Sequence, residues 1–199
     1  MRIRFYPTEK TTKTMLEEIA RKNEIEYFRF DSYVQIPGDY STPSRIERDH
    51  KIISSVHLDE SYFDKDNGRT TVNGINSYVE LRNGKKGHLR QLDIDELKGT
   101  VEEILAGTRI ILKGIWGDFE GNPEGFLIQS SPQNFHFLGG DILNREQFNQ
   151  WICRAYEHPR ESIQKWAELQ KARGYSNLRV TDSKFKPYVP RVMYKMQIS

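Results

Sequence analysis

The hydrophobic period of the chain changes twice near its beginning. Ile3 and Phe5 fall on the same face of a short predicted strand, which Pro7 ends. Residues 9–22 carry apolar side chains at helical spacing, and the aromatic-rich residues 25–30 predict a second strand. Strand, helix and strand in this order indicate a βαβ start, with a right-handed crossover if the two strands pair in parallel.

The next part of the chain predicts a short helix and then a hairpin. A weak helical period predicts the helix within residues 41–57. Residues 70–81 alternate between apolar and polar side chains, and a turn at 83–87 leads back into residues 88–92. We therefore expect an antiparallel hairpin with basic residues at its tip.

The segment after this hairpin carries both helical and strand periods. Residues 93–106 place five apolar side chains on one helical stripe, although Gly99 weakens this helix. From Arg109 the period changes to two, which predicts a strand as far as residue 116. Strands at 126–129 and 135–138 follow, so we expect an antiparallel meander.

The clearest helical signal lies in the last third of the chain. Asn144 and Gln147 have the spacing of a capping box, and the apolar residues after them recur at helical intervals. Pro159 ends this helix and begins the next, which Gly174 terminates. We expect a helical hairpin followed by a basic tail over residues 175–199.

Together these elements predict an α+β fold. It consists of an N-terminal strand–helix–strand unit, a central antiparallel meander, a C-terminal helical hairpin and a basic tail. The length of 199 residues suits a single α+β domain over 1–199. The alternative is a division near residue 140, with a mixed sheet region over 1–140 and the helical hairpin plus tail over 141–199.

The composition is that of a globular protein with a thin core. Hydrophobic residues make up 36% of the chain and charged residues 29%, the net charge is +2 and the mean hydropathy is -0.74. The small net charge and the 23 aromatic side chains (ten Phe, ten Tyr and three Trp) argue against disorder. The single cysteine, Cys153, excludes a disulfide framework within one chain and a zinc site built from several cysteines.

The sequence predicts neither export nor membrane insertion. Charged and apolar residues alternate over residues 1–7, unlike the apolar core of a signal peptide. No apolar run approaches the about 20 residues that a helix needs to cross a bilayer. We therefore expect a cytoplasmic protein in a reducing compartment.

Acidic residues supply one candidate for chemistry, a metal site. His57 precedes four carboxylates within ten positions, and such oxygen ligands suit Mg²⁺ or Mn²⁺. The carboxylates are Asp59, Glu60, Asp64 and Asp66. The spacing does not match an EF-hand, because a loop that begins at Asp64 places Gly68 fifth instead of sixth. A solvated loop is the interpretation that we favour.

A second metal hypothesis uses an acid–x–lysine triplet, in which the lysine helps to activate the attacking water. Glu96 begins one such triplet and Asp182 begins another, with Asp141 as an upstream partner for the second. Lys98 and Lys184 end the two triplets. Triplets of this kind arise often by chance in a chain so rich in charge.

Basic residues are concentrated in two regions, although the chain as a whole is nearly neutral. The hairpin over 82–90 carries four Lys or Arg. The tail over 173–199 carries six against Asp182 alone, so the chain outside the tail, hairpin included, carries a net −3. Cations neutralise phosphates, and aromatic rings stack on unpaired bases at about 1–3 kcal/mol per base. The predicted electrostatic and stacking contacts are Lys85, Lys86, Arg90, Lys184, Lys186, Tyr188, Arg191, Tyr194 and Lys195.

Several of these residues also have a purely structural interpretation. A C-terminal strand could bury Phe185, Val189 and Met193 while its lysines extend into solvent. Trp151 and Trp166 could line a ligand site, but their helical spacing favours core packing. His136 could pair with Asp141 as an acid–base couple or as a surface hydrogen bond, and Cys153 is expected to be partly buried.

The absence of complete catalytic motifs narrows the function. The sequence has no nucleophile elbow, no phosphate-binding loop, no His-Glu-x-x-His and no zinc-deaminase signature. Our leading hypothesis is a small cytosolic accessory protein that binds a nucleic acid or a nucleic-acid-processing complex without catalysis or a cofactor. An inhibitor from a mobile element is one form of this hypothesis. The alternatives are a metal-dependent nuclease or phosphodiesterase that uses Mg²⁺ or Mn²⁺, and an inhibitor or immunity-type factor that recognises only protein.

Overall fold

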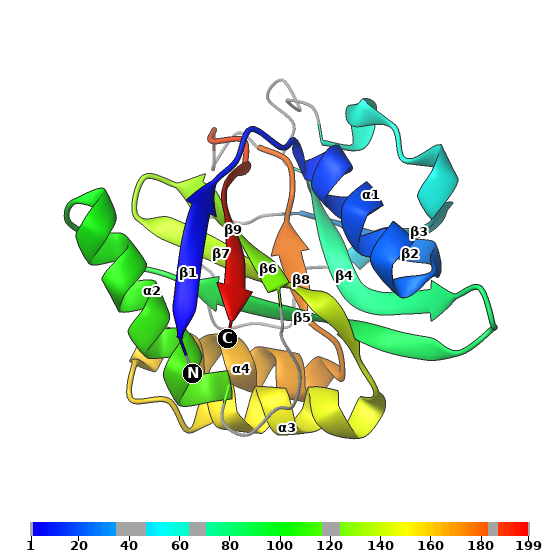
Figure 1. Ribbon diagram of the computed structural model, residues 1–199. Helices are drawn as coiled ribbons and strands as arrows, with labels where there is room; N and C mark the ends of the chain where they lie inside the picture. Colours follow the sequence, from blue (N-terminus) through cyan, green and yellow to red (C-terminus); the bar gives the residue numbers. More distant parts are fainter. Residues whose placement is uncertain (1, 35–46, 64–70, 117–123, 183–186, 199) are drawn as a thin grey trace.

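A computed structural model describes residues 2–34, 47–63, 71–116, 124–182 and 187–198. Within these ranges the chain forms four α-helices and nine β-strands that belong to a single sheet (Figure 1). The helices are α1 (Thr12–Asn23), α2 (Val101–Trp116), α3 (Arg145–Tyr156) and α4 (Glu161–Arg173). The strands are β1 (Ile3–Pro7), β2 (Ile25–Val34), β3 (Glu47–Ser54), β4 (Thr71–Leu81), β5 (Lys86–Ile94), β6 (Glu124–Ser131), β7 (Asn134–Leu143), β8 (Asn177–Arg179) and β9 (Arg191–Ile198).

The strands are antiparallel and lie in the order β1-β9-β6-β7-β5-β4-β2-β3. The predicted α+β class, the meander, the N-terminal strand–helix–strand unit and the helical hairpin are confirmed. Parallel pairing of the first two strands is not observed, because five other strands separate β1 from β2 in the sheet. The last strand, β9, lies between β1 and β6 and so connects the end of the chain to its beginning.

The short strand β8 changes the shape of the sheet in its middle. On β4, residues 74–76 pair with β8, whereas residues 78–80 pair with β5. After His88 the pairing of β5 with β4 stops, whereas its pairing with β7 on the opposite edge continues to Ile94. Strands β4 and β5 therefore diverge after the hairpin, and β8 takes the place beside β4 that β5 leaves.

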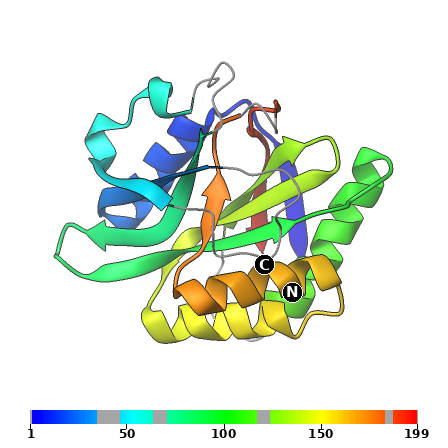
Figure 2. The same ribbon diagram turned by 180° about the vertical axis from the view of Figure 1, so that it is seen from behind.

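Apolar cores cover both faces of the sheet. On one face α2, α3 and α4 pack around Trp116, Trp151 and Phe137, and the two indole rings lie 5.7 Å apart at their centroids. On the other face α1 packs against Phe28 and its neighbours on β2 and β4. Figures 1 and 2 show α1 on one side of the sheet, away from the other three helices.

Burial on both faces explains the continuous apolar runs of the central strands. Leu127 of β6 belongs to the core under α2, α3 and α4, whereas its neighbours Phe126 and Ile128 belong to the core under α1. Successive side chains of a strand point to opposite faces, so a strand between two cores loses its polar face.

Two predicted elements are wrong, and a third has different bounds. In place of the predicted helix within 41–57, the described residues from 47 onward form β3 and a short 3₁₀ helix at Ser55–His57. The predicted helix over 93–106 is helical only from Val101, because residues 93–94 end β5, and α2 continues through the predicted strand over 109–116. The isoleucine-rich run fits a period of two, but Ile111 and Ile115 are buried one helical turn apart while Ile110 is exposed.

The C-terminal strand buries a different set of side chains from the one predicted. Val192, Met196 and Ile198 of β9 are buried, whereas the predicted Val189 and Met193 are only half-buried. The third predicted residue, Phe185, lies outside the described residues. Trp151 is fully buried, as predicted, but Trp166 is only partly buried. Among the described residues, no helix has both the length and the apolar character to span a bilayer.

Alanine substitutions at Gly125 and Gly114 test this packing, because they should change the free energy of unfolding in opposite directions. A Cβ on Gly125 of β6 would lie 2.4 Å from Cε2 of Phe137 and 3.0 Å from the carbonyl oxygen of Leu138. Gly125→Ala should therefore lower the free energy of unfolding by about 2 kcal/mol. On α2 a Cβ at Gly114 would meet His158 only at 3.5 Å. Gly114→Ala should raise the free energy of unfolding by about 0.5–1 kcal/mol, measured by urea unfolding.

Candidate functional site

The predicted basic residues of the hairpin separate into an exposed pair and a buried arginine. Lys85 and Lys86 are exposed at the β4–β5 hairpin tip, which projects on the side of the molecule opposite α2 (Figure 1). Arg90 is only 2% exposed, and its guanidinium donates to both carboxylate oxygens of Asp141 at 3.1 and 2.5 Å. It also lies 4.2 Å from the ring centroid of Trp116. Arg90 is thus part of the core and does not extend the basic tip.

The described residues of the tail are also engaged in the fold. The Lys195 ammonium lies 2.8 Å from Glu18 and 3.4 Å from Glu124, and the hydrogen bond to Glu18 raises the pKa of Lys195. Its neighbour Tyr194 faces the other side of β9, where its ring packs against Phe5.

Tyr188 and Arg191 lie before and at the start of β9. The Tyr188 hydroxyl donates to Gln129 at 3.2 Å, and its carbonyl accepts from Arg179 at 2.7 Å. Arg191 is exposed. Lys184 and Lys186 lie outside the described residues. In Figures 1 and 2, β9 lies far from the hairpin tip, so the described cations of the tail and those of the tip do not form one surface.

The predicted acidic ligands are not brought together where the structure describes them. Asp59 accepts from the backbone N–H of Ser61 at 2.8 Å, which lowers the pKa of Asp59, and Asp141 is paired with Arg90. Asp182 is 4% exposed and lies in the segment after β8. Asp64 and Asp66 lie outside the described ranges. Among the described residues, no three or more His, Cys, Asp or Glu side chains form a group that could hold a metal ion.

Two other predicted positions differ from expectation. His136 does not pair with Asp141, because its Nε2 lies 3.6 Å from Asp93 Oδ1 across the β5–β7 pairing. Cys153, predicted to be partly buried, is exposed on α3.

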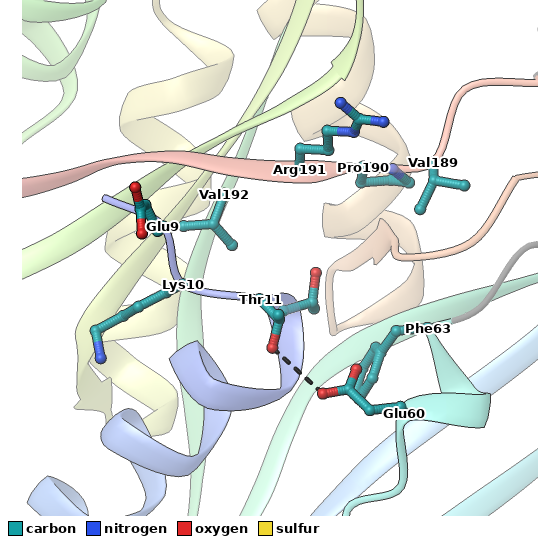
Figure 3. Close-up of a pocket in the computed structure, with 10 residues that line it drawn as sticks. Glu9, Lys10, Thr11, Glu60, Phe63, Val189, Pro190, Arg191 and Val192 are labelled. Atoms are coloured by element: carbon teal, nitrogen blue, oxygen red, sulfur yellow. Dashed lines mark hydrogen bonds between the residues drawn. The ribbon is translucent and has the colours of Figure 1, made fainter. Parts of the chain in front are cut away.

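A pocket of about 310 Å³ lies at the start of α1 (Figure 3). It brings together Glu60 and Arg191 from two of the predicted sets, and the Thr11 hydroxyl donates to Glu60 at 3.5 Å. Its other charged side chains are Glu9 and Lys10, and Lys10 is paired with Glu18. The wall therefore carries two cations and two carboxylates, a balance that favours no single charge class of ligand.

Aromatic and cationic side chains share one face of β2, β3, β4 and β5. Tyr27 of β2 lies opposite Glu80 of β4, which in turn lies opposite Lys86 of β5. Directly paired residues share a face of the sheet, and so do residues two apart along a strand. The face therefore also carries Arg29, Tyr78 and, opposite Arg29 on β3, Ile52. With Tyr175, which contacts Arg29, we call this surface the tyrosine face: Tyr27, Arg29, Ile52, Tyr78, Lys86 and Tyr175.

Two cation–aromatic pairs lie on the tyrosine face. The Arg29 guanidinium lies 5.1 Å from the ring centroid of Tyr175, and the Lys86 ammonium lies 6.0 Å from that of Tyr78. The three tyrosines are half-buried and Lys86 is exposed, so part of each tyrosine side chain and the Lys86 charge are accessible. The nearby charge of Glu26 raises the pKa of Tyr27, which keeps its hydroxyl protonated and able to donate a hydrogen bond.

A buried carboxylate holds Arg29 in this position. Asp31 is 0% exposed, and its Oδ1 accepts from Arg29 Nε at 2.8 Å. Its Oδ2 accepts from the side-chain amides of Asn76 at 2.6 Å and Asn177 at 2.8 Å. The four residues come from β2, β4 and β8, so the Arg29 side chain is tied to three strands.

A buried histidine lies beside Tyr78. The His88 ring meets Tyr78 edge-on at 5.7 Å and stacks on Phe148 of α3 at 4.2 Å. Its Nδ1 lies 3.1 Å from the Ser77 hydroxyl. Burial, with a smaller effect from Arg145, lowers the pKa of His88 to about 4, so the imidazole is neutral at neutral pH. Ser77 and His88 are both buried, and the His88 ring lies beside Tyr78 as its direct partner on β5.

Of the tyrosine face, sequence reasoning predicted only Lys86 as a site residue. It missed Tyr27, Arg29, Ile52, Tyr78 and Tyr175. The signal for the first two was present, because Tyr27 and Arg29 alternate with Phe28 and Phe30 in a strand whose apolar face is buried. Tyr175 had no local signal, since it contacts Arg29 only because β8 lies beside β4.

No family model, curated protein or solved structure matches this chain. Its function has to be inferred from the chemistry of the described residues.

Removal of the Asp31 carboxylate should show whether it supports the sheet. Asp31→Ala would leave Arg29 and two buried amides without their acceptor, so the free energy of unfolding should fall by about 3 kcal/mol in urea unfolding. Asp59→Ala, which removes an exposed carboxylate with one backbone hydrogen bond, should change it far less. An equal decrease in the free energy of unfolding in the two variants would show that the Asp31 carboxylate does not support the sheet.

The low pKa of His88 predicts a pH-dependent loss of stability. The ordinary pKa of histidine is 6.5, and that of His88 in the folded protein is about 4. Between these two pH values the His88 side chain is therefore protonated in the unfolded chain but neutral in the folded protein. The free energy of unfolding should therefore decrease over this range by up to about 3 kcal/mol from this residue. His88→Asn retains a side-chain nitrogen for Ser77 and should flatten the pH dependence, measured by urea unfolding at about pH 7.5 and about pH 4.5. His57→Asn, at an exposed position, should retain the wild-type dependence.

Proposed function

We propose that this protein is a non-catalytic binding protein that docks on nucleic acid, alone or within a processing complex, through the tyrosine face. The observation that carries this proposal is the presence of the two pairs Arg29–Tyr175 and Lys86–Tyr78 on one sheet face. Exposed cations neutralise backbone phosphates, and aromatic rings offer stacking surfaces to bases. Both chemistries are available here within one set of adjacent strands.

The location of the positive charge also supports nucleic-acid binding through the tyrosine face. Arg82 and Lys85 are exposed in the turn of the hairpin that carries Lys86, and so they extend the cationic side of the tyrosine face. Two carboxylates lie at the Tyr27 side of this face: Glu80, paired between Tyr27 and Lys86, and Glu26, whose charge acts on Tyr27. Basic residues at one end of an aromatic surface are the pattern expected where a phosphate backbone passes beside stacked bases.

The burial of Asp31 and His88, the titratable groups next to the tyrosine face, favours binding over catalysis. Asp31 is fully buried and accepts three hydrogen bonds, so both of its carboxylate oxygens are engaged within the fold. His88 is 4% exposed, with its Nδ1 against Ser77. Neither group can reach a ligand on the surface without rearrangement, whereas a general base must lie within hydrogen-bond reach of its substrate.

The proposal can be tested by fluorescence anisotropy with labelled single-stranded and duplex oligonucleotides of about 20 nucleotides at several salt concentrations. Tyr78→Ala should lower the affinity about 5- to 100-fold if the ring stacks on a base. Because Tyr78 also contacts His88, Tyr27→Ala provides a second variant away from that histidine. Lys86→Ala should make the plot of log affinity against log salt shallower by about 0.7 for a single strand.

Matched controls come from the far end of the sheet. Tyr6 of β1 is 43% exposed and lies opposite Lys195 on β9, so Tyr6→Ala removes a ring beside a lysine without altering the tyrosine face. Lys165→Ala removes an exposed lysine on α4. Both controls should bind as wild type does. Absence of polyanion binding, or equal losses in Tyr6→Ala and Tyr78→Ala, would contradict the proposal.

A further inference from the structure

The outer side of α2 exposes apolar surface at a margin of the molecule. Helix α2 lies beside β1 at the edge of both views (Figures 1 and 2), and Arg109 donates to the carbonyl of Ile3 at 3.2 Å. Its inner side is buried in the core through Ile111, Leu112 and Ile115. Ile110 on the outer side is 71% exposed. Among the described residues, the other exposed isoleucine is Ile52, and its exposed fraction is smaller.

The exposed stripe around Ile110 has a symmetric pattern. Ala106 and Ile110 lie two residues on either side of position 108, and Glu103 and Lys113 lie five residues on either side of it. All four are exposed. Their spacing of three or four residues places them along one side of the helix. The small Ala106 is therefore matched by the large Ile110 at the same distance from position 108. The negative Glu103 is matched by the positive Lys113 in the same way.

This pattern is complementary to an antiparallel copy of itself. When two identical helices pair about a two-fold axis at position 108, Ile110 of each faces Ala106 of the other, where the small side chain leaves space for it. Glu103 of each then faces Lys113 of the other, so opposite charges meet on both sides of the axis. Position 108 lies near the middle of α2, which runs from Val101 to Trp116, so the two helices overlap over their full length.

We propose that α2 is the interface of a symmetric homodimer, with a second copy of this chain docked antiparallel on the Glu103–Ala106–Ile110–Lys113 stripe. A heterologous protein partner is the other possible occupant, but it would not require matched positions about one point of the helix. A single pair of helices buries a small area, so the dimer should be weak and its formation should fall with rising salt. This inference does not depend on the proposed nucleic-acid binding.

Analytical ultracentrifugation of the full chain between about 5 and 500 μM tests the proposal. Wild type should shift from monomer toward dimer over this range. Ile110→Asp should remain monomeric, because an exposed apolar contact is replaced by two like charges near the axis. Ile52→Asp is the matched control, since Ile52 is 68% exposed on the tyrosine face, and it should dimerise as wild type does. A wild type that stays monomeric throughout, or an Ile110→Asp dimer, would overturn the proposal.

Disulfide trapping tests the antiparallel register independently of affinity. In a Cys153→Ser background, a mixture of Ala106→Cys and Ile110→Cys chains should cross-link to each other faster than either chain cross-links to itself. Lys113→Glu should reduce dimer formation several-fold at low salt and much less at high salt. Faster cross-linking within the Ala106→Cys or the Ile110→Cys sample alone would exclude this register and overturn the proposed arrangement.

Discussion

The buried carboxylate of Asp31 is the interaction on which the central part of the sheet depends. A buried carboxylate without donors would be too costly to retain, so its three hydrogen bonds have to be present whenever β2 and β4 are in place. One donor, Asn177, belongs to β8, a strand of only three residues that has little backbone pairing of its own. Gly74 makes room for this contact, since a Cβ there would lie 1.8 Å from Asn177 Oδ1. The carboxylate thus joins the segment after α4 to the N-terminal strands, and it also orients Arg29 on the tyrosine face.

Other buried cations have similar structural roles, which reduces the number available for binding. Arg90 is enclosed by Asp141 and the rings of Trp116 and Trp151. Arg179 donates to the carbonyls of Thr181, Tyr188 and Ser130 and so connects the end of β8 to β6 and to the residues just before β9. Net charge in a segment is therefore a poor measure of its surface charge, because charged groups are buried where paired partners can meet their hydrogen-bonding needs.

Features that depend only on residues close together in the sequence could be predicted, as the start of α3 and the end of α4 illustrate. The Asn144–Gln147 capping box forms as its spacing predicts, and Gly174 ends α4 in the left-handed conformation. The burial of Arg90 could not be predicted, since its partner Asp141 is 51 residues away. For α2, the run of isoleucines fits either period, and only the packing of Ile111 and Ile115 under α3 and α4 selects the helix. Of the six residues of the tyrosine face only Lys86 was predicted, from the hairpin turn, whereas Tyr175 joins the face only through the pairing of β8 with β4.

The two surfaces inferred for this protein lie at opposite margins of the sheet. The tyrosine face is on β2, β3, β4 and β5, whereas α2 lies beside β1, the strand at the other end of the sheet order (Figure 1). A dimer through α2 would therefore leave both tyrosine faces uncovered and pointing away from the axis. Each face offers only a few cations and three rings, so one face alone should bind weakly. Two such faces in one particle would raise the local concentration of the second site once the first has bound, provided that the nucleic acid is long enough to reach both. In that arrangement, length of the nucleic acid contributes more to affinity than base sequence does, because stacking tolerates any base.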